Sequence, residues 1–302
     1  MKNIKIKVLS LTTLIMLLAF SRAISYDSND LYNEQIKVLE FRNTVTKGLV
    51  CSYLSVKKIQ PILDISGKQT FSIDLSFADT VSPLYFYKFE KQNFPLFSVD
   101  RNILSDVELQ TFNLNATLRL PYNFIGTLVF SYLPELEINK IIKYNLKVNL
   151  NFYYNFIKDA LFKTGLYAGI GYNYTTGLSV IQNNLSSTIS ETNVTFIGNL
   201  NSHWNYQGIN FSLFANNQLL IFNFWGRVDY YILFGGINSQ FEGASSVSAV
   251  ANCLLIDNNT IYGIVFSGGM EIALGWFKIN IEAGKDLLSS GMYVNTGIRI
   301  GY

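Results

Sequence analysis

The sequence predicts an all-β protein, an antiparallel transmembrane β-barrel of about twelve strands, with ten or fourteen strands as the alternatives. Long runs of the chain alternate apolar and polar residues with a period of two, as strands between two environments do. Of its 302 residues 49% are hydrophobic and only 15% are charged, against roughly 25% charged in an average soluble domain. Beyond the N-terminal segment, no uncharged apolar run approaches the length of a spanning helix. We therefore expect the chain to cross a membrane as strands.

The N-terminal segment 1–23 has the pattern of a cleaved secretory signal peptide. Lys2, Lys5 and Lys7 form a basic head, an apolar stretch runs from Val8 to Phe20, and Ala23 provides a small residue at the cleavage position. Cleavage there removes these lysines and Arg22, which changes the formal net charge from +2 to −2. The basicity belongs to the signal, so nucleic acid is not an implied partner.

The next segment, residues 24–67, lacks good alternation. It mixes acidic residues with Leu31, Ile36, Leu39 and Phe41 at near-helical spacing. We interpret it as a periplasmic N-terminal extension or a plug of the lumen. Residues 68–302 then form the transmembrane barrel.

The clearest strand runs from Lys143 to Phe156, where one face is wholly apolar and the other almost wholly polar. At this length it is more than twice the usual strand of roughly 5 to 6 residues, whereas a tilted transmembrane strand needs only about 9 to 11. A soluble sandwich would point its polar face at water, and a barrel would point it into the lumen. The length of the strands and a polar face rich in Asn, Gly and Ser favour the barrel, with the sandwich as the alternative.

Alternation of short periplasmic turns and long external loops gives the predicted topology. We expect tight turns at Pro121–Asn123, Ile157–Ala160, Tyr206–Gly208, Gly235–Gly236 and Gly275–Trp276. We expect external segments at Asp79–Glu108, Thr175–Asn193 and Asn252–Thr260, and parity then requires a strand between Ile237 and Ala251.

The C-terminal strand carries the most specific resemblance. Met292, Val294, Thr296, Ile298, Ile300 and Tyr302 occupy alternate positions and the strand ends on an aromatic residue. In this pattern the chain resembles bacterial outer-membrane β-barrel proteins. The resemblance implies the outer membrane of a diderm bacterium as the location, outer-membrane lipid as the surroundings, and recognition by the barrel-insertion machinery through the strand ending at Tyr302.

The polar faces of the strands predict the residues that line the lumen. These are Arg119, Lys143, Lys147, Lys163, Asn199, Asn201, His203, Arg227, Asp229, Glu271, Lys278, Glu282 and Arg299, together with Asp74. The basic side chains outnumber the acidic ones, which predicts a channel for passive passage of small, anionic solutes. In the alternative the charges pair with one another, and a closed barrel acts as a surface adhesin or binding platform through its external loops.

The sequence favours no enzyme and no cofactor. The single histidine, His203, follows Ser202 directly, so the two side chains lie on opposite faces of a strand and form no nucleophile–base pair. One histidine and two distant cysteines also give no usual metal site. The predicted topology puts Cys51 on the periplasmic side and Cys253 outside, which is too far apart for a disulfide.

Overall fold

The computed structural model describes most of the predicted barrel region and isolated positions before it. The described ranges are 70–82, 107–133, 142–159, 163–189, 192–245, 251–288 and 291–301, together with Asn33, Ile36, Leu39, Glu40, Asn43, Thr46, Lys47 and Val50, all of them helical. The predicted signal peptide 1–23, Cys51 and Tyr302 lie outside the described residues. Within the described part, no helix is long and apolar enough to cross a membrane.

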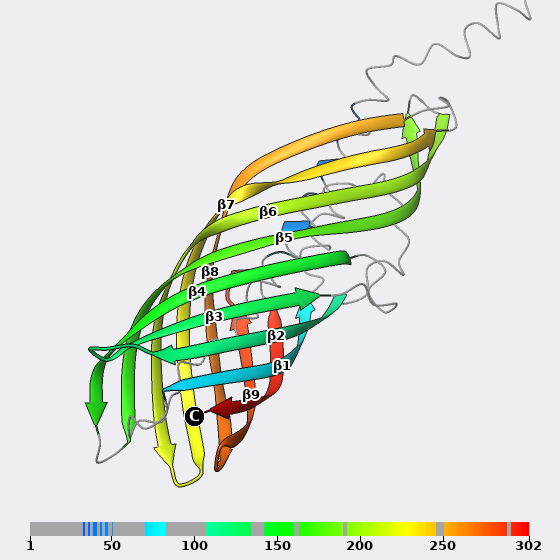
Figure 1. Ribbon diagram of the computed structural model, residues 1–302. Coiled ribbons are helices and arrows are strands. Elements are labelled where there is room, and N and C mark those ends of the chain that lie inside the picture. Colours follow the sequence, from blue (N-terminus) through cyan, green and yellow to red (C-terminus); the bar gives the residue numbers. More distant parts are fainter. Residues whose placement is uncertain are drawn as a thin grey trace, which may run out of the picture.

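Ten antiparallel strands close into a barrel (Figure 1). They are β1 (Phe71–Ser82), β2 (Val107–Arg119), β3 (Phe124–Leu133), β4 (Ile142–Asp159), β5 (Thr164–Ile189), β6 (Thr192–Leu219), β7 (Phe222–Ser245), β8 (Ala251–Leu274), β9 (Phe277–Asp286) and β10 (Met292–Gly301). Each strand pairs with its neighbours in sequence, and β10 pairs with β1 to close the ring. The antiparallel barrel is confirmed, the count of twelve is wrong, and the alternative of ten describes the structure.

One end of the barrel carries the tight connections. The β2–β3 turn uses left-handed backbone at Tyr122 and Asn123, and the β6–β7 and β8–β9 turns do so at Leu220 and Gly275. The first and last strands also reach this end, where Gly301 N donates to Trp276 O at 3.2 Å. Because barrels of this kind place their short turns in the periplasm, we expect this end to face the periplasm.

At the opposite end four strands rise well beyond the rest (Figure 1). The β4–β5 pairing ends at Ile142 and Ser179, and the β8–β9 pairing ends at Val265 and Asp286. Beyond these pairs β5, β6, β7 and β8 continue as one sheet. We call this part the external sheet. It includes residues 180–189, 192 and 193 of the segment predicted as a loop at Thr175–Asn193, and the whole segment predicted as a loop at Asn252–Thr260. It also includes the first nine residues of the strand predicted between Ile237 and Ala251.

The predicted count exceeds the observed count by two strands because two predicted turns lie inside β6 and β7. The turn at Tyr206–Gly208 lies in the middle of β6, and the turn at Gly235–Gly236 lies in the middle of β7. Tyr206 and Gly235 are direct partners in the sheet, so both predicted turns fall at the same height. A Cβ on Gly235 would meet the backbone of Tyr206, so the glycine marks a close approach of two strands.

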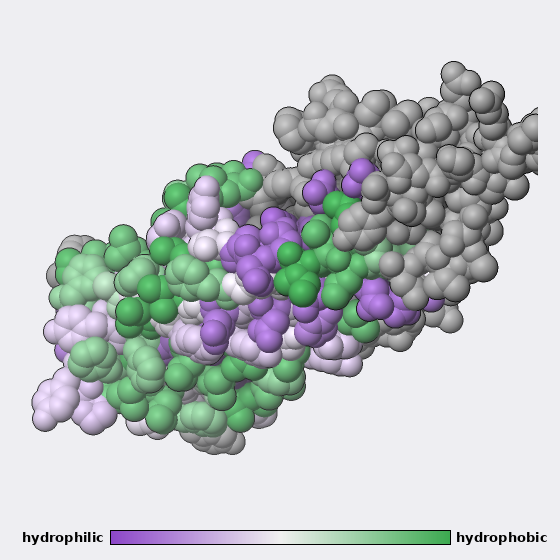
Figure 2. Space-filling model, turned by 90° about the horizontal axis from the view of Figure 1, so that it is seen from above, coloured by the Kyte–Doolittle hydropathy of each residue, from purple (hydrophilic) through white to green (hydrophobic). Residues whose placement is uncertain are grey.

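The outer face changes polarity at that height. On β6 the outward residues Ile209, Phe211 and Leu213 are exposed and apolar, whereas those further up the strand are polar. On β7 the outward apolar positions end at Phe234, and polar positions follow. Figure 2 shows the same division, with apolar atoms over the part of the wall near the tight turns and polar atoms toward the external sheet. The apolar part is a lipid-facing belt, and its upper limit marks the membrane surface.

Glycines on the inner face accommodate the large inward side chains. In five places an aromatic residue on one strand is the direct partner of a glycine on the neighbouring strand, and a Cβ on that glycine would collide with the ring. The pairs are Tyr153–Gly169, Trp204–Gly177, Trp225–Gly269, Tyr231–Gly263 and Tyr293–Gly284. Each ring therefore lies over the site where a neighbouring side chain would otherwise stand. These pairs let five large rings fit inside a narrow barrel.

We expect Gly269→Ala to destabilise the barrel by about 1–3 kcal/mol, because the new methyl group displaces the Trp225 ring into a packed interior. Urea unfolding in lipid vesicles, followed by tryptophan fluorescence, measures this effect. Gly226→Ala is the matched control, since a Cβ on that outward glycine meets no atom within 4 Å. Equal stability of the two variants would contradict the packing argument.

Candidate functional site

The most distinctive inner feature is a buried group of paired charges on the wall formed by β7, β8, β9, β10 and β1. Arg227 Nε lies 2.7 Å from Asp229 Oδ2, and Arg227 Nη2 lies 3.1 Å from Glu282 Oε1. Arg299 Nη1 lies 3.0 Å from Glu271 Oε2, and its Nε lies 3.6 Å from Asp74 Oδ2. We call these six residues, with Lys278, the ionic cluster; every member is buried.

Hydrogen bonds give the carboxylates of the ionic cluster further partners. Tyr293 Oη donates to Glu282 Oε1 at 2.7 Å, and Asn280 Nδ2 donates to Asp74 Oδ2 at 2.8 Å. Ser212 Oγ donates to Asp229 Oδ1. A buried carboxylate is tolerated only when it is paired and hydrogen-bonded. These partners therefore offset the desolvation free energy of the ionic cluster inside the membrane.

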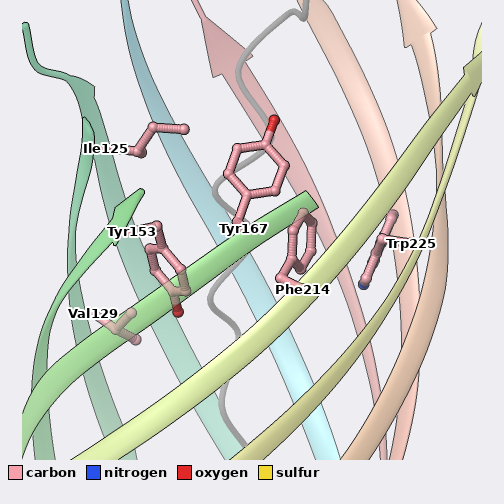
Figure 3. Close-up of a cluster of buried hydrophobic side chains, with 6 residues drawn as sticks. All are labelled: Ile125, Val129, Tyr153, Tyr167, Phe214 and Trp225. Atoms are coloured by element: carbon pink, nitrogen blue, oxygen red, sulfur yellow. The ribbon is translucent and has the colours of Figure 1, made fainter. Parts of the chain in front are cut away.

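The part of the wall from β3 to β7 contains an apolar and aromatic cluster among buried polar side chains such as Asn149 and Asn210. Six buried side chains from β3 to β7 form one cluster, which we call the aromatic cluster: Ile125, Val129, Tyr153, Tyr167, Phe214 and Trp225. Figure 3 shows them pointing into the interior of the barrel. Phe214 pairs directly with Arg227 in the β6–β7 ladder, so the aromatic and ionic clusters meet there.

The two clusters face each other across the lumen. Tyr153 on β4, Asp229 on β7 and Glu282 on β9 are all buried. In the ring of ten strands β4 and β9 lie opposite each other. Burial of inward side chains on both sides of the ring indicates that the described residues fill the lumen at this level.

The inward charges of the described wall do not carry the predicted positive excess. The basic ones are Arg119, Lys147, Arg227, Lys278 and Arg299, and the acidic ones are Asp74, Asp229, Asp257, Glu271, Glu282 and Asp286. Asp286, which accepts a hydrogen bond of 2.6 Å from Tyr231 Oη, and Asp257 were missing from the prediction. Lys278 Nζ lies 3.6 Å from Glu271 Oε1.

Several predicted lining residues lie elsewhere. Asn199, Asn201 and His203 point outward on β6, because their inward neighbours are Ser202 and Trp204. The cause is the change of polarity at the membrane surface: above it the outer face is polar, so the polar side of the strand no longer marks the lumen. Lys163 stands exposed in the β4–β5 turn. The side chain of Lys143 lies outside the described part.

The helical residues before the barrel contact its inner face. Leu39, Asn43, Thr46 and Val50 are buried at helical spacing, and Lys47 Nζ lies 2.6 Å from Asp257 Oδ2. Asp257 points inward from β8, in the external sheet. This ion pair joins the helix to the external half of the barrel.

No family model and no curated protein matches the chain. The solved structures that it resembles include the outer membrane protease OmpT from Escherichia coli (TM-score 0.49, 8% identity, 77% of this chain and 97% of that one). They also include the translocator domain of the autotransporter NalP from Neisseria meningitidis (TM-score 0.39, 9% identity, 91% and 99%) and an outer membrane channel from Pseudomonas putida F1 (TM-score 0.36, 8% identity, 81% and 100%).

The closed barrel and its lipid-facing belt define the class of this protein. It is a β-barrel of the bacterial outer-membrane type, as the resemblance of its C-terminal strand implied. The solved structures with which it shares this fold have different activities, and none of these activities is assigned to this chain.

We expect Arg227→Met to destabilise the barrel by about 3–5 kcal/mol, because it leaves Asp229 and Glu282 buried without their cation. Lys163→Met, which removes an exposed cation from a turn, is the control and is expected to change stability by less than about 0.5 kcal/mol. Unfolding in lipid vesicles measures both. A stable Arg227→Met variant would show that the ionic cluster contributes little to the barrel.

Proposed function

We propose that the protein is a closed outer-membrane barrel that acts as a binding platform at the cell surface. The observation that carries this proposal is the burial of inward side chains on opposite strands, Tyr153 of β4 and Glu282 of β9, which supports a filled lumen. The balance of inward charges gives no support to anion selectivity. The external sheet is the part that reaches beyond the membrane and offers a surface for a partner; its outer face is polar on β6 and β7 and carries exposed Leu254 and Ile256 on β8.

The N-terminal helix supports the closed state. The Lys47–Asp257 ion pair and the burial of Leu39 and Thr46 favour the plug over the periplasmic extension as the role of segment 24–67. We infer that the helix occupies the external half of the lumen, while the aromatic and ionic clusters fill the lumen nearer the periplasm.

The proposal includes outer-membrane lipid as the surroundings and no catalytic chemistry. Ser202 points inward and bonds to Ser239 through its hydroxyl, whereas His203 points outward, so the two do not form a catalytic pair. β10 presents alternate outward residues and closes the ring, as expected of a strand that the insertion machinery reads.

We expect the purified, refolded full chain to show no discrete conductance steps in a planar bilayer, because buried inward side chains on opposite strands fill the lumen. Heat-modifiable mobility on gels verifies that the inserted protein is folded. Discrete steps from folded protein would contradict the closed barrel and restore the channel hypothesis. The reversal potential across a salt gradient would then test the predicted preference for anions.

The platform requires the external sheet to face the cell exterior. In a background with Cys51→Ser and Cys253→Ser, we expect Glu242→Cys to react with a membrane-impermeant maleimide on intact cells, because Glu242 is exposed on the outer face of β7. Lys163→Cys, in a periplasmic turn, should react only after the outer membrane is permeabilised. The reverse labelling pattern would show that the external sheet faces the periplasm and would contradict the proposal of a surface binding platform.

A further inference from the structure

A groove lies on the outer face of the barrel at the lower edge of the external sheet. It has a volume of about 550 Å³ and is lined by Tyr174, His203, Asn205, Gln207, Phe234, Gly235, Gly236, Asn238 and Asn258. We call it the amide groove. Its volume falls within the range of small-molecule sites, roughly 300–1,000 Å³.

Strand register explains why the groove is there. Asn205, Gly236 and Asn258 are consecutive partners across β6, β7 and β8. Since Gly236 has no side chain, the middle of this row is a depression flanked by two carboxamides. The row above pairs His203 with Asn238, and the row below pairs Gln207 with both Tyr174 and Phe234. The groove thus has a glycine floor, polar walls and two aromatic residues on its membrane side.

The groove sits at the membrane surface. Phe234 is the last outward apolar residue of β7, and Gln207 is the first polar one above Ile209 on β6. A ligand in the groove would lie beside lipid headgroups of the outer leaflet, with its remainder over the lipid-facing belt. This position favours a lipid over a solute from the medium.

The chemistry of the lining selects the kind of headgroup. The nine residues include no carboxylate, lysine or arginine, so the lining has no fixed charge to attract a phosphate. Four carboxamides each offer a donor and an acceptor, as the hydroxyl groups of a sugar require. Tyr172 Oη donates to Gln207 Oε1 at 2.9 Å, which orients that amide with its nitrogen left to donate to a ligand. The ring of Phe234 adds an apolar surface for the face of a sugar ring.

We propose that the amide groove binds the saccharide headgroup of a glycolipid in the outer leaflet. The site is independent of the lumen, so it stands whether the barrel is closed or conducting. None of its polar residues belongs to the ionic cluster.

The test measures binding of a rough-type lipopolysaccharide, a glycolipid with a short sugar core, to the full chain in phospholipid nanodiscs. We expect Asn205→Ala/Asn258→Ala to weaken binding by about tenfold or more, because both carboxamides beside the glycine floor are lost. Asn201→Ala/Gln240→Ala is the matched control: these two residues are direct partners on the same outer face, one row above the groove, and should bind like the unsubstituted protein.

Three results would overturn the proposal. Equal binding by the groove variant and the control variant would remove the amide groove as the site. Equal binding of the isolated sugar core and the intact glycolipid would identify a site for soluble saccharides. Displacement of the glycolipid by inorganic phosphate would show recognition of charge. Circular dichroism and heat-modifiable mobility verify that both double variants are folded.

Discussion

The structure depends on one constraint: a backbone in hydrocarbon must pair all of its N–H and C=O groups within the protein. An antiparallel sheet meets this constraint only when its edges join, as β1 and β10 do here. Ten strands give a narrow ring, and a narrow ring leaves its inward side chains no room to avoid one another. The paired charges and closely packed rings of the interior are therefore a consequence of closure with few strands.

Within that narrow ring, two kinds of complementary pair fill the interior. Large rings lie over glycines of neighbouring strands, as Tyr153 does over Gly169 and Tyr293 over Gly284. Charges on β7 to β1 pair across next-neighbour strands, as Arg227 does with Glu282. In both kinds of pair, each member occupies space or balances charge that its partner leaves.

The sequence predicts the class of fold because alternation survives in every strand, and it predicts the turns at Pro121–Asn123 and Gly275–Trp276 because the chain reverses there on left-handed backbone at Asn123 and Gly275. It fails at Tyr206–Gly208 and Gly235–Gly236 because the polar side of each strand exchanges faces there. A strand that passes from lipid into water inverts its pattern without turning. Because of this inversion the sequence wrongly predicts Asn199, Asn201 and His203 as lumen-lining residues. For the same reason it gives no indication of the groove on the outer face. The pairings of Arg299 and Asp286 join strands that only register brings together, so no local pattern could indicate them.

The inversion on β6 and β7 also fixes how deep the barrel sits. Because Tyr206 and Gly235 are partners, the change from apolar to polar occurs at one level on both strands. Raising the barrel would expose Ile209 and Phe211 to water at about 25 cal/mol for each Å² of apolar surface, and lowering it would carry Asn205 and Asn238 into hydrocarbon. Both displacements are unfavourable, so the barrel has one preferred insertion depth. The external sheet therefore keeps a constant height above the bilayer.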